Sequence, residues 1–191
     1  VVFMSDNGPD PLTGERFNEE LRGTKYQVYE GGIRVPCFFA WQGHIQNGRR
    51  DQVITGVDVF PTLLELCGLP AATVNPIDGK SLVNVLHDKA VPFETTRCWQ
   101  WNRANPNYTH NAAVRQGTFK LVRPYVTRGI RLKDSQLPSV LYDLENDPRE
   151  TTDVSASYPD VFENLKKSLE AWCASVEHDR TRRLVHYQMP H

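Results

Sequence analysis

The stretch from Leu21 to Pro36 reads LRGTKYQVYEGGIRVP and places a lysine two residues after a glycine and ahead of a diglycine turn. The pair Gly31-Gly32 should turn the backbone sharply. The apolar run at residues 37–41 follows and predicts a strand that is buried on both faces. Lys25 lies in a glycine-flanked stretch, where backbone amides and one ammonium group can together meet an anion. A solvated surface lysine is the alternative interpretation.

Upstream of this stretch, four apolar residues precede Ser5-Asp6-Asn7-Gly8, a pattern that predicts a buried strand running into a turn. Ligands of α/β proteins collect at the carboxyl ends of strands, and carboxylate and amide oxygens suit Ca²⁺ or Mg²⁺. An ordinary Asx turn ending in Gly8 is the alternative. Two ligands also fall short of the about 6 to 8 oxygens that Ca²⁺ takes.

Downstream, the pattern predicts a helix from Asp58, as its N-cap, to about Cys67, and a shorter helix at residues 81–87. The character changes near residues 90–94. The strand-like segments beyond that point are 96–101, 111–115, 118–123 and 140–144, with a tight hairpin at Gln116-Gly117 and a final helix at 159–176. We therefore predict an α/β portion at residues 1–92 and a small antiparallel sheet with one helix at residues 93–191.

The overall composition excludes several classes of protein. The 22 Lys and Arg residues nearly balance the 23 Asp and Glu residues, which argues against a nucleic-acid partner bound by bulk charge. No apolar run approaches the roughly 20 residues of a membrane helix. The four cysteines form no C-x-x-C pair, which excludes a zinc ribbon or a thioredoxin-type site. Buried free thiols are expected at Cys37, Cys67 and Cys173.

Five segments, taken in order, resemble type I sulfatases of the alkaline phosphatase superfamily. They are residues 2–8, 21–36, 41–45, 58–82 (as 58–64, 68–70 and 78–82) and, in two pieces, 114–122 with 141–150. The resemblance implies the C-terminal part of an alkaline-phosphatase-like mixed-sheet α/β domain, followed by a small α+β domain. The sequence departs from the family pattern at Thr24 and Tyr26, where glycine is common, and at Gln42, which replaces the proline of W-P-G.

The same resemblance implies hydrolysis of a sulfate ester by a formylglycine hydrate, which derives from a cysteine or serine in a C-x-P-S-R type motif. By position, Asp6 and Asn7 would be ligands of Ca²⁺, and Lys25 would bind the sulfate. Glu30 and Arg34 would pair with each other beneath the site. None of the four cysteines is followed by x-P-S-R. The nucleophile is therefore expected upstream, in a longer sulfatase of which this chain is the C-terminal portion, and the chain alone is expected to be inactive.

Other interpretations remain open. A non-catalytic sulfatase-like module for binding or assembly is one, with Trp99, Trp101, Tyr108 and His110 as possible stacking groups for a sugar. A phosphonate monoester hydrolase or phosphatase of the same superfamily is another. His44 and His110 are possible substrate contacts, although each is a lone histidine.

The expected partner of the parent enzyme is a sulfated small molecule or glycan, and the family resemblance leaves a periplasmic, secreted or lysosomal location open. The isolated chain is also expected to self-associate. A large sheet that is cut at residue 1 would expose apolar strand edges and faces, and such surfaces favour pairing between chains.

Overall fold

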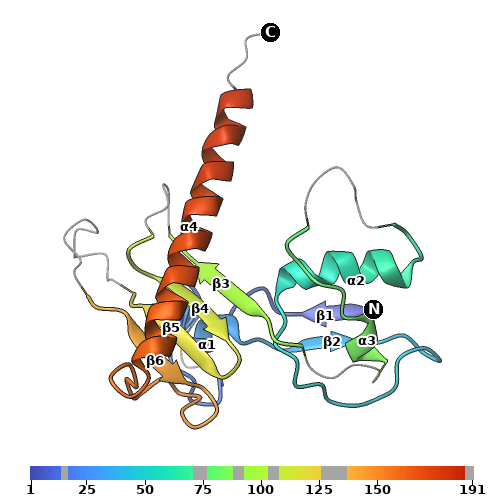
Figure 1. The fold of residues 1–191 in the computed structure, drawn as a ribbon. Coiled ribbons are helices and arrows are strands. Elements are labelled where there is room, and N and C mark those ends of the chain that lie inside the picture. The colour runs from blue at the N-terminus through green and yellow to red at the C-terminus, as the bar shows by residue number, and fades with distance from the viewer. Residues whose placement is uncertain (14–16, 71–76, 88–92, 103–107, 126–136, 188–191) are drawn as a thin grey trace. The chain divides into compact units, whose positions relative to one another are not determined.

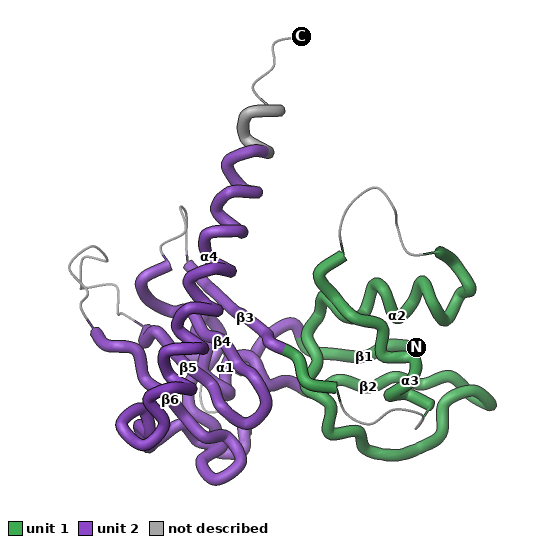
Figure 2. The backbone as a smooth tube through the Cα atoms, in the orientation of Figure 1, with its two compact units in different colours: residues 1–5, 36–95 green, residues 6–35, 96–191 purple. Residues whose placement is uncertain are grey.

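The computed structural model describes residues 1–191 except 14–16, 71–76, 88–92, 103–107, 126–136 and 188–191 (Figure 1). The chain divides into two compact units, of which the first comprises residues 1–5 and 36–95 and the second residues 6–35 and 96–191 (Figure 2). The predicted mixed α/β architecture with antiparallel strands and a C-terminal helix is confirmed. The predicted boundary between an α/β portion at residues 1–92 and a small domain at residues 93–191 refers to the domains of a complete sulfatase, and it stays a prediction.

The first unit contains a two-stranded antiparallel sheet and short helices. Its elements are β1 (Val2–Met4), β2 (Cys37–Phe39), the 3₁₀ turn η2 (Gly56–Asp58), α2 (Val59–Leu66) and α3 (Val83–Leu86). The prediction that both strands are buried is wrong for this chain, since Phe3 is 65% and Phe38 61% exposed. A sheet of two strands has too few neighbours to cover both of its faces.

Asp58 holds the first unit together in a way that differs from its predicted role. Its side chain makes no capping bond to α2. It instead accepts the backbone N–H groups of Thr55 and Lys80, both at 2.8 Å, and the residue is fully buried. Thr62, on the next turn of α2, accepts the N–H of Leu82 at 2.9 Å. The start of α2 is therefore tied to residues 80–82 by two buried polar side chains, each of which satisfies backbone donors.

The cysteines are free thiols, as predicted. Cys173 is buried, and Cys37 is half-buried in β2. The burial predicted for Cys67 is wrong, because this residue follows the last turn of α2 and is exposed.

The second unit is built on a four-stranded antiparallel sheet in the order β3-β4-β5-β6. The strands are β3 (Thr96–Gln100), β4 (Ala112–Gln116), β5 (Phe119–Arg123) and β6 (Val140–Asp143); the helices are η1 (Pro11–Thr13), α1 (Glu30–Ile33) and α4 (Pro159–Tyr187). The predicted hairpin is confirmed: Gln116 pairs with Phe119, and Gly117 adopts φ = 58°. α4 continues well past residue 176. No helix in the described ranges is long and apolar enough to cross a membrane.

The two faces of this sheet are covered by different layers. α4 packs on one face (Figure 1), where Leu165 and Leu169 join a core with alternate strand residues. That core consists of Ala112, Val114, Leu121, Leu141, Leu165, Leu169 and Cys173. On the opposite face, Val28 and Tyr29 pack against the intervening strand residues Ala113, Val122 and Tyr142, together with Leu144. The glycine-rich stretch singled out in the sequence is therefore the second cover of the sheet.

Candidate active site

The turn that carries Asp6 and Asn7 is fixed to α1 by its glycine. The N–H of Gly8 donates to the carbonyl of Gly32 at 2.9 Å. A Cβ atom at Gly8 would overlap the carbonyl oxygen of Gly31, so only glycine allows this approach. One step further along, the N–H of Lys25 donates to the carbonyl of Pro9 at 2.9 Å. The structure thus brings the predicted metal-ligand turn and the predicted sulfate lysine onto one backbone frame.

The ammonium group of Lys25 stays accessible on this frame. Its side chain is 37% exposed and lies 3.8 Å from a carboxylate oxygen of Asp10. The Nζ atom is also 5.5 Å from the ring centroid of Tyr26. An ion pair at this exposure contributes little to stability. The positive charge therefore remains available to an anion.

Asp6 and Asn7 offer oxygens of the kind that Ca²⁺ prefers. Asp6 is exposed and Asn7 is half-buried, and they follow β1 with Ser5 in between. A carboxylate and an amide oxygen form a hard donor set that is compatible with Ca²⁺. Within the described ranges, no three His, Cys, Asp or Glu residues gather into a group that could hold a metal ion. Asp6 and Asn7 therefore fit part of a coordination shell, and their role as ligands stays a prediction.

The two candidate histidines lie in different units and different surroundings. His44 is exposed in the first unit, and its ring stacks on Trp41 with centroids 4.1 Å apart. His110 is 4% exposed in the second unit, where burial lowers its pKa. Its ring therefore favours the neutral form at pH 7. A substrate contact by either residue stays a prediction.

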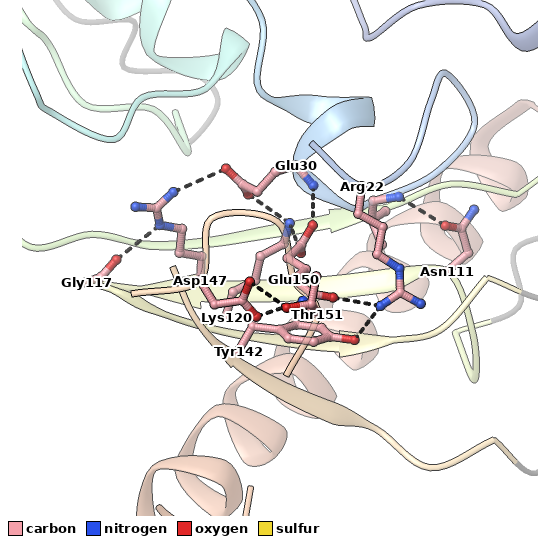
Figure 3. A network of polar contacts seen from close by, with 11 residues as sticks. Arg22, Glu30, Asn111, Gly117, Lys120, Tyr142, Asp147, Glu150 and Thr151 are labelled. Atoms are coloured by element: carbon pink, nitrogen blue, oxygen red, sulfur yellow. Dashed lines mark hydrogen bonds and ion pairs between the residues drawn. The ribbon is translucent and has the colours of Figure 1, made fainter. Parts of the chain in front are cut away.

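A buried charge cluster holds α1 on the sheet (Figure 3). Lys120 of β5 is fully buried, and its Nζ atom lies 2.8 Å from Glu30 and 2.9 Å from Glu150. The backbone N–H of Glu30 also donates to the Glu150 carboxylate, at 2.6 Å. Arg115 completes the cluster at 3.6 Å from Glu30. The predicted Glu30–Arg34 pair is wrong, because the carboxylate of Glu30 turns toward the sheet while Arg34 is exposed.

The buried environment shifts the pKa values of two of these groups. Burial raises the pKa of Glu150, and the positive charge of Lys120 opposes that rise. Burial likewise lowers the pKa of Arg115, against the attraction of Glu30. Both shifts have the sign that desolvation of a charged group produces.

Arg22 makes a second tie between the glycine-rich stretch and the sheet (Figure 3). Its guanidinium donates to the hydroxyl of Tyr142 at 2.8 Å and to the carbonyl of Glu150 at 2.9 Å. The same group lies 4.2 Å from the ring centroid of Tyr29. Arg22 and Lys120 together fix both ends of the segment that carries Lys25.

Sequence reasoning missed Lys120, although one signal was present. In β5, Leu121 faces α4, so Lys120 and Val122 face the opposite side by the period-two rule. A lysine at an inward position of a strand needs a carboxylate partner.

Comparison with known proteins identifies the family. The family described as N-sulphoglucosamine sulphohydrolase, C-terminal, matches residues 23–175. A sulfatase of Formosa agariphila is 31% identical over 90% of this chain and 32% of its own length. An N-acetylgalactosamine-6-O-sulfatase of Bacteroides thetaiotaomicron is 28% identical over 90% of this chain and 35% of its own length.

A solved structure shows the same fold. The structure of Ps i-CgsB in complex with k-i-k-neocarrahexaose superposes with a TM-score of 0.71 at 27% identity, over 90% of this chain and 35% of that one. The chain thus spans about a third of the length of the curated relatives it matches. These matches agree with the order of the sequence motifs and with the C-terminal sheet that is covered on both faces. The chain belongs to the sulfatase family and corresponds to the C-terminal portion of such proteins.

Proposed function

We propose that this chain is part of an enzyme that hydrolyses sulfate esters, and that Lys25 binds the sulfate group. The observation that supports this most is the shared backbone frame, in which Gly8 of the Asp6-Asn7 turn hydrogen-bonds to Gly32 of α1, and Lys25 hydrogen-bonds to Pro9 at the end of the same turn. An ammonium group carried by this frame would complement the negative charge of the transferring sulfuryl group. The formylglycine nucleophile would come from residues outside this chain.

Asp6 and Asn7 would contribute oxygens to a Ca²⁺ ion, which when bound supplies Lewis-acid polarisation and a template for the sulfate group. The rest of its ligands would come from outside the 191 residues. The proposal assigns the two residues a shared role, because they are adjacent and follow the same strand.

Replacing Lys25 with alanine in the full-length protein should lower kcat for 4-nitrophenyl sulfate by about 10² to 10³-fold, the usual effect of removing one charge-stabilising group. Lys25→Arg should retain part of the activity, because it keeps the charge. Lys167→Ala, an exposed lysine of α4, is the matched control. The isolated 191-residue chain should show no turnover.

An unchanged kcat in Lys25→Ala would contradict the proposed role. Two other outcomes would favour a different function for the full-length protein. Faster hydrolysis of a phosphonate monoester than of the sulfate ester would favour the phosphonate hydrolase alternative. Tight binding of a sulfated glycan without any turnover by the full-length protein would favour the non-catalytic module.

The substrate class that we propose is a sulfated glycan. The support comes from two similar proteins: one is an N-acetylgalactosamine-6-O-sulfatase, and the other was solved in complex with k-i-k-neocarrahexaose. Hydrolysis of sulfated monosaccharides by the full-length protein, at a higher kcat/KM than simple aryl sulfates, is the expected result.

We also propose that the isolated 191-residue chain self-associates through its first unit. Phe3, Phe38 and Phe60 are 65%, 61% and 55% exposed, and the rings of Phe3 and Phe38 lie 6.1 Å apart. Exposed apolar side chains, above all the neighbouring rings of Phe3 and Phe38, favour association. Light scattering at increasing concentration should show oligomers that Phe38→Ser weakens, whereas Leu12→Ser, an exposed leucine of the second unit, should not. A monodisperse monomer at high concentration would contradict the proposal.

A further inference from the structure

Asn111 ties Tyr26, the residue that follows Lys25, to Trp101. Asn111 is buried, with only 1% of its surface exposed, and its backbone adopts φ = 47°. The amide nitrogen donates to the carbonyls of Tyr26 and Trp101, both at 2.8 Å. The amide oxygen accepts the N–H of Val28 at 3.2 Å. One buried side chain thus fixes the end of the Lys25 segment and the end of β3 to each other.

The rings of Tyr26 and Trp101 contact each other, and the Tyr26 ring lies near the ammonium group of Lys25. The centroids of Tyr26 and Trp101 are 5.0 Å apart with a tilt of 51°, and Nζ of Lys25 is 5.5 Å from the Tyr26 ring. Tyr26 adopts φ = 81°, in the left-handed region that side chains disfavour. Such strain persists where the surroundings enforce it, and it concentrates at binding sites.

These rings are not part of the apolar core. The cluster on their side of the sheet contains Val28, Tyr29, Ala113, Val122, Tyr142 and Leu144, with Trp99, Tyr125 and Val140 packed against it. Tyr26 and Trp101 belong to neither of the two core clusters, and both keep part of their surface exposed. Core packing therefore does not explain why a tyrosine occupies a strained backbone position there.

We propose that Tyr26 and Trp101 form a subsite for the sugar ring that carries the sulfate ester. This inference rests on the proposed function of Lys25. The sulfate oxygens would meet the ammonium group, and the apolar C–H face of the same sugar would pack on the aromatic surface beside it. Asn111 is a positioning residue for the subsite. It holds the backbone of both aromatic residues and would not touch the sugar itself.

Calorimetric binding to the full-length protein separates the two contributions. The probes are inorganic sulfate, which has no ring, and three sulfated sugars: N-acetylgalactosamine 6-sulfate, N-acetylglucosamine 6-sulfate and galactose 4-sulfate. Trp101→Ala and Tyr26→Gly should weaken the best-bound sugar about tenfold and inorganic sulfate far less. Glycine suits φ = 81°, so the second variant removes the ring without disturbing the backbone. Lys25→Ala should weaken both kinds of probe.

The control is Phe17→Ala, which removes an 89% exposed aromatic ring elsewhere in the second unit and should change neither affinity. Two results would overturn the subsite alone: sugar affinity unchanged in both Trp101→Ala and Tyr26→Gly, or no sugar binding more tightly than inorganic sulfate. If the unmodified protein binds neither sulfate nor any sugar, the result contradicts the proposed role of Lys25, and the subsite proposal that rests on it is contradicted as well.

Discussion

Replacing Lys120 with methionine should lower the free energy of unfolding by about 3 to 5 kcal/mol, the usual cost of removing one partner of a buried ion pair. Lys120 is fully buried and lies within 2.9 Å of two carboxylates, Glu30 and Glu150. Methionine fills a similar volume but leaves both negative charges without their central partner. Arg115, at 3.6 Å from Glu30, compensates only one of them. Urea unfolding followed by circular dichroism measures the loss.

The pH dependence of this variant has a definite sign. Burial raises the pKa of Glu150, so the folded state holds its proton more tightly than the unfolded state does. Such a group favours folding at low pH, and that contribution is lost as the pH rises through the folded pKa. Removing Lys120 takes away the charge that opposed the shift and raises the pKa further. The stability deficit of Lys120→Met should therefore shrink as the pH falls from 7 toward 5.

Two further variants test the cause. Lys120→Met combined with Glu150→Gln should recover part of the lost stability, because the glutamine carries no charge that needs compensation. Lys167→Met, on the exposed face of α4, should change stability by no more than about 0.5 kcal/mol. A deficit in Lys120→Met that is independent of pH and is not reduced in the double variant would show that lost packing, rather than buried charge, is responsible.

The fold of the second unit could be predicted from the sequence because its signals are local. The Gln116-Gly117 pair predicts the hairpin between β4 and β5, and the sequence predicts the C-terminal helix, whose Leu165 and Leu169 pack on the sheet. The burial of β1 and β2 could not be predicted in the same way. Apolar composition predicts that a strand is buried, but it does not say which segment packs against the strand. In this structure Phe3 and Phe38 remain exposed.

The candidate site could be predicted only in part, for a related reason. Asp6, Asn7 and Lys25 stand in short motifs, so pattern and resemblance point to them. Lys120 meets Glu30 across 90 positions of sequence, and Trp101 meets Tyr26 across a similar gap. Such pairings depend on which strand lies beneath the glycine-rich stretch. That is a property of the folded sheet and not of any single segment.

Replacing Gly31 with alanine should disrupt the Lys25 segment more than any change of a surface side chain. A Cβ atom there would collide with the carbonyl oxygen of Gly23 and come within 2.6 Å of that of Arg22. These are backbone atoms, so α1 itself has to move away from residues 21–23. We expect a loss of roughly 3 kcal/mol in stability, together with loss of sulfate binding, because α1 carries Glu30 and supports the Gly8 turn.

Gly56→Ala is the matched control, since a Cβ atom at Gly56 meets nothing within 4 Å. It should change stability by no more than about 0.5 kcal/mol. Thermal unfolding and calorimetric titration with inorganic sulfate read out stability and the site separately. Normal sulfate affinity in a folded Gly31→Ala protein would mean that Lys25 does not depend on the frame formed by α1. Sulfate affinity that disappears while most of the stability is retained would show that the close approach at Gly31 serves mainly to position the site.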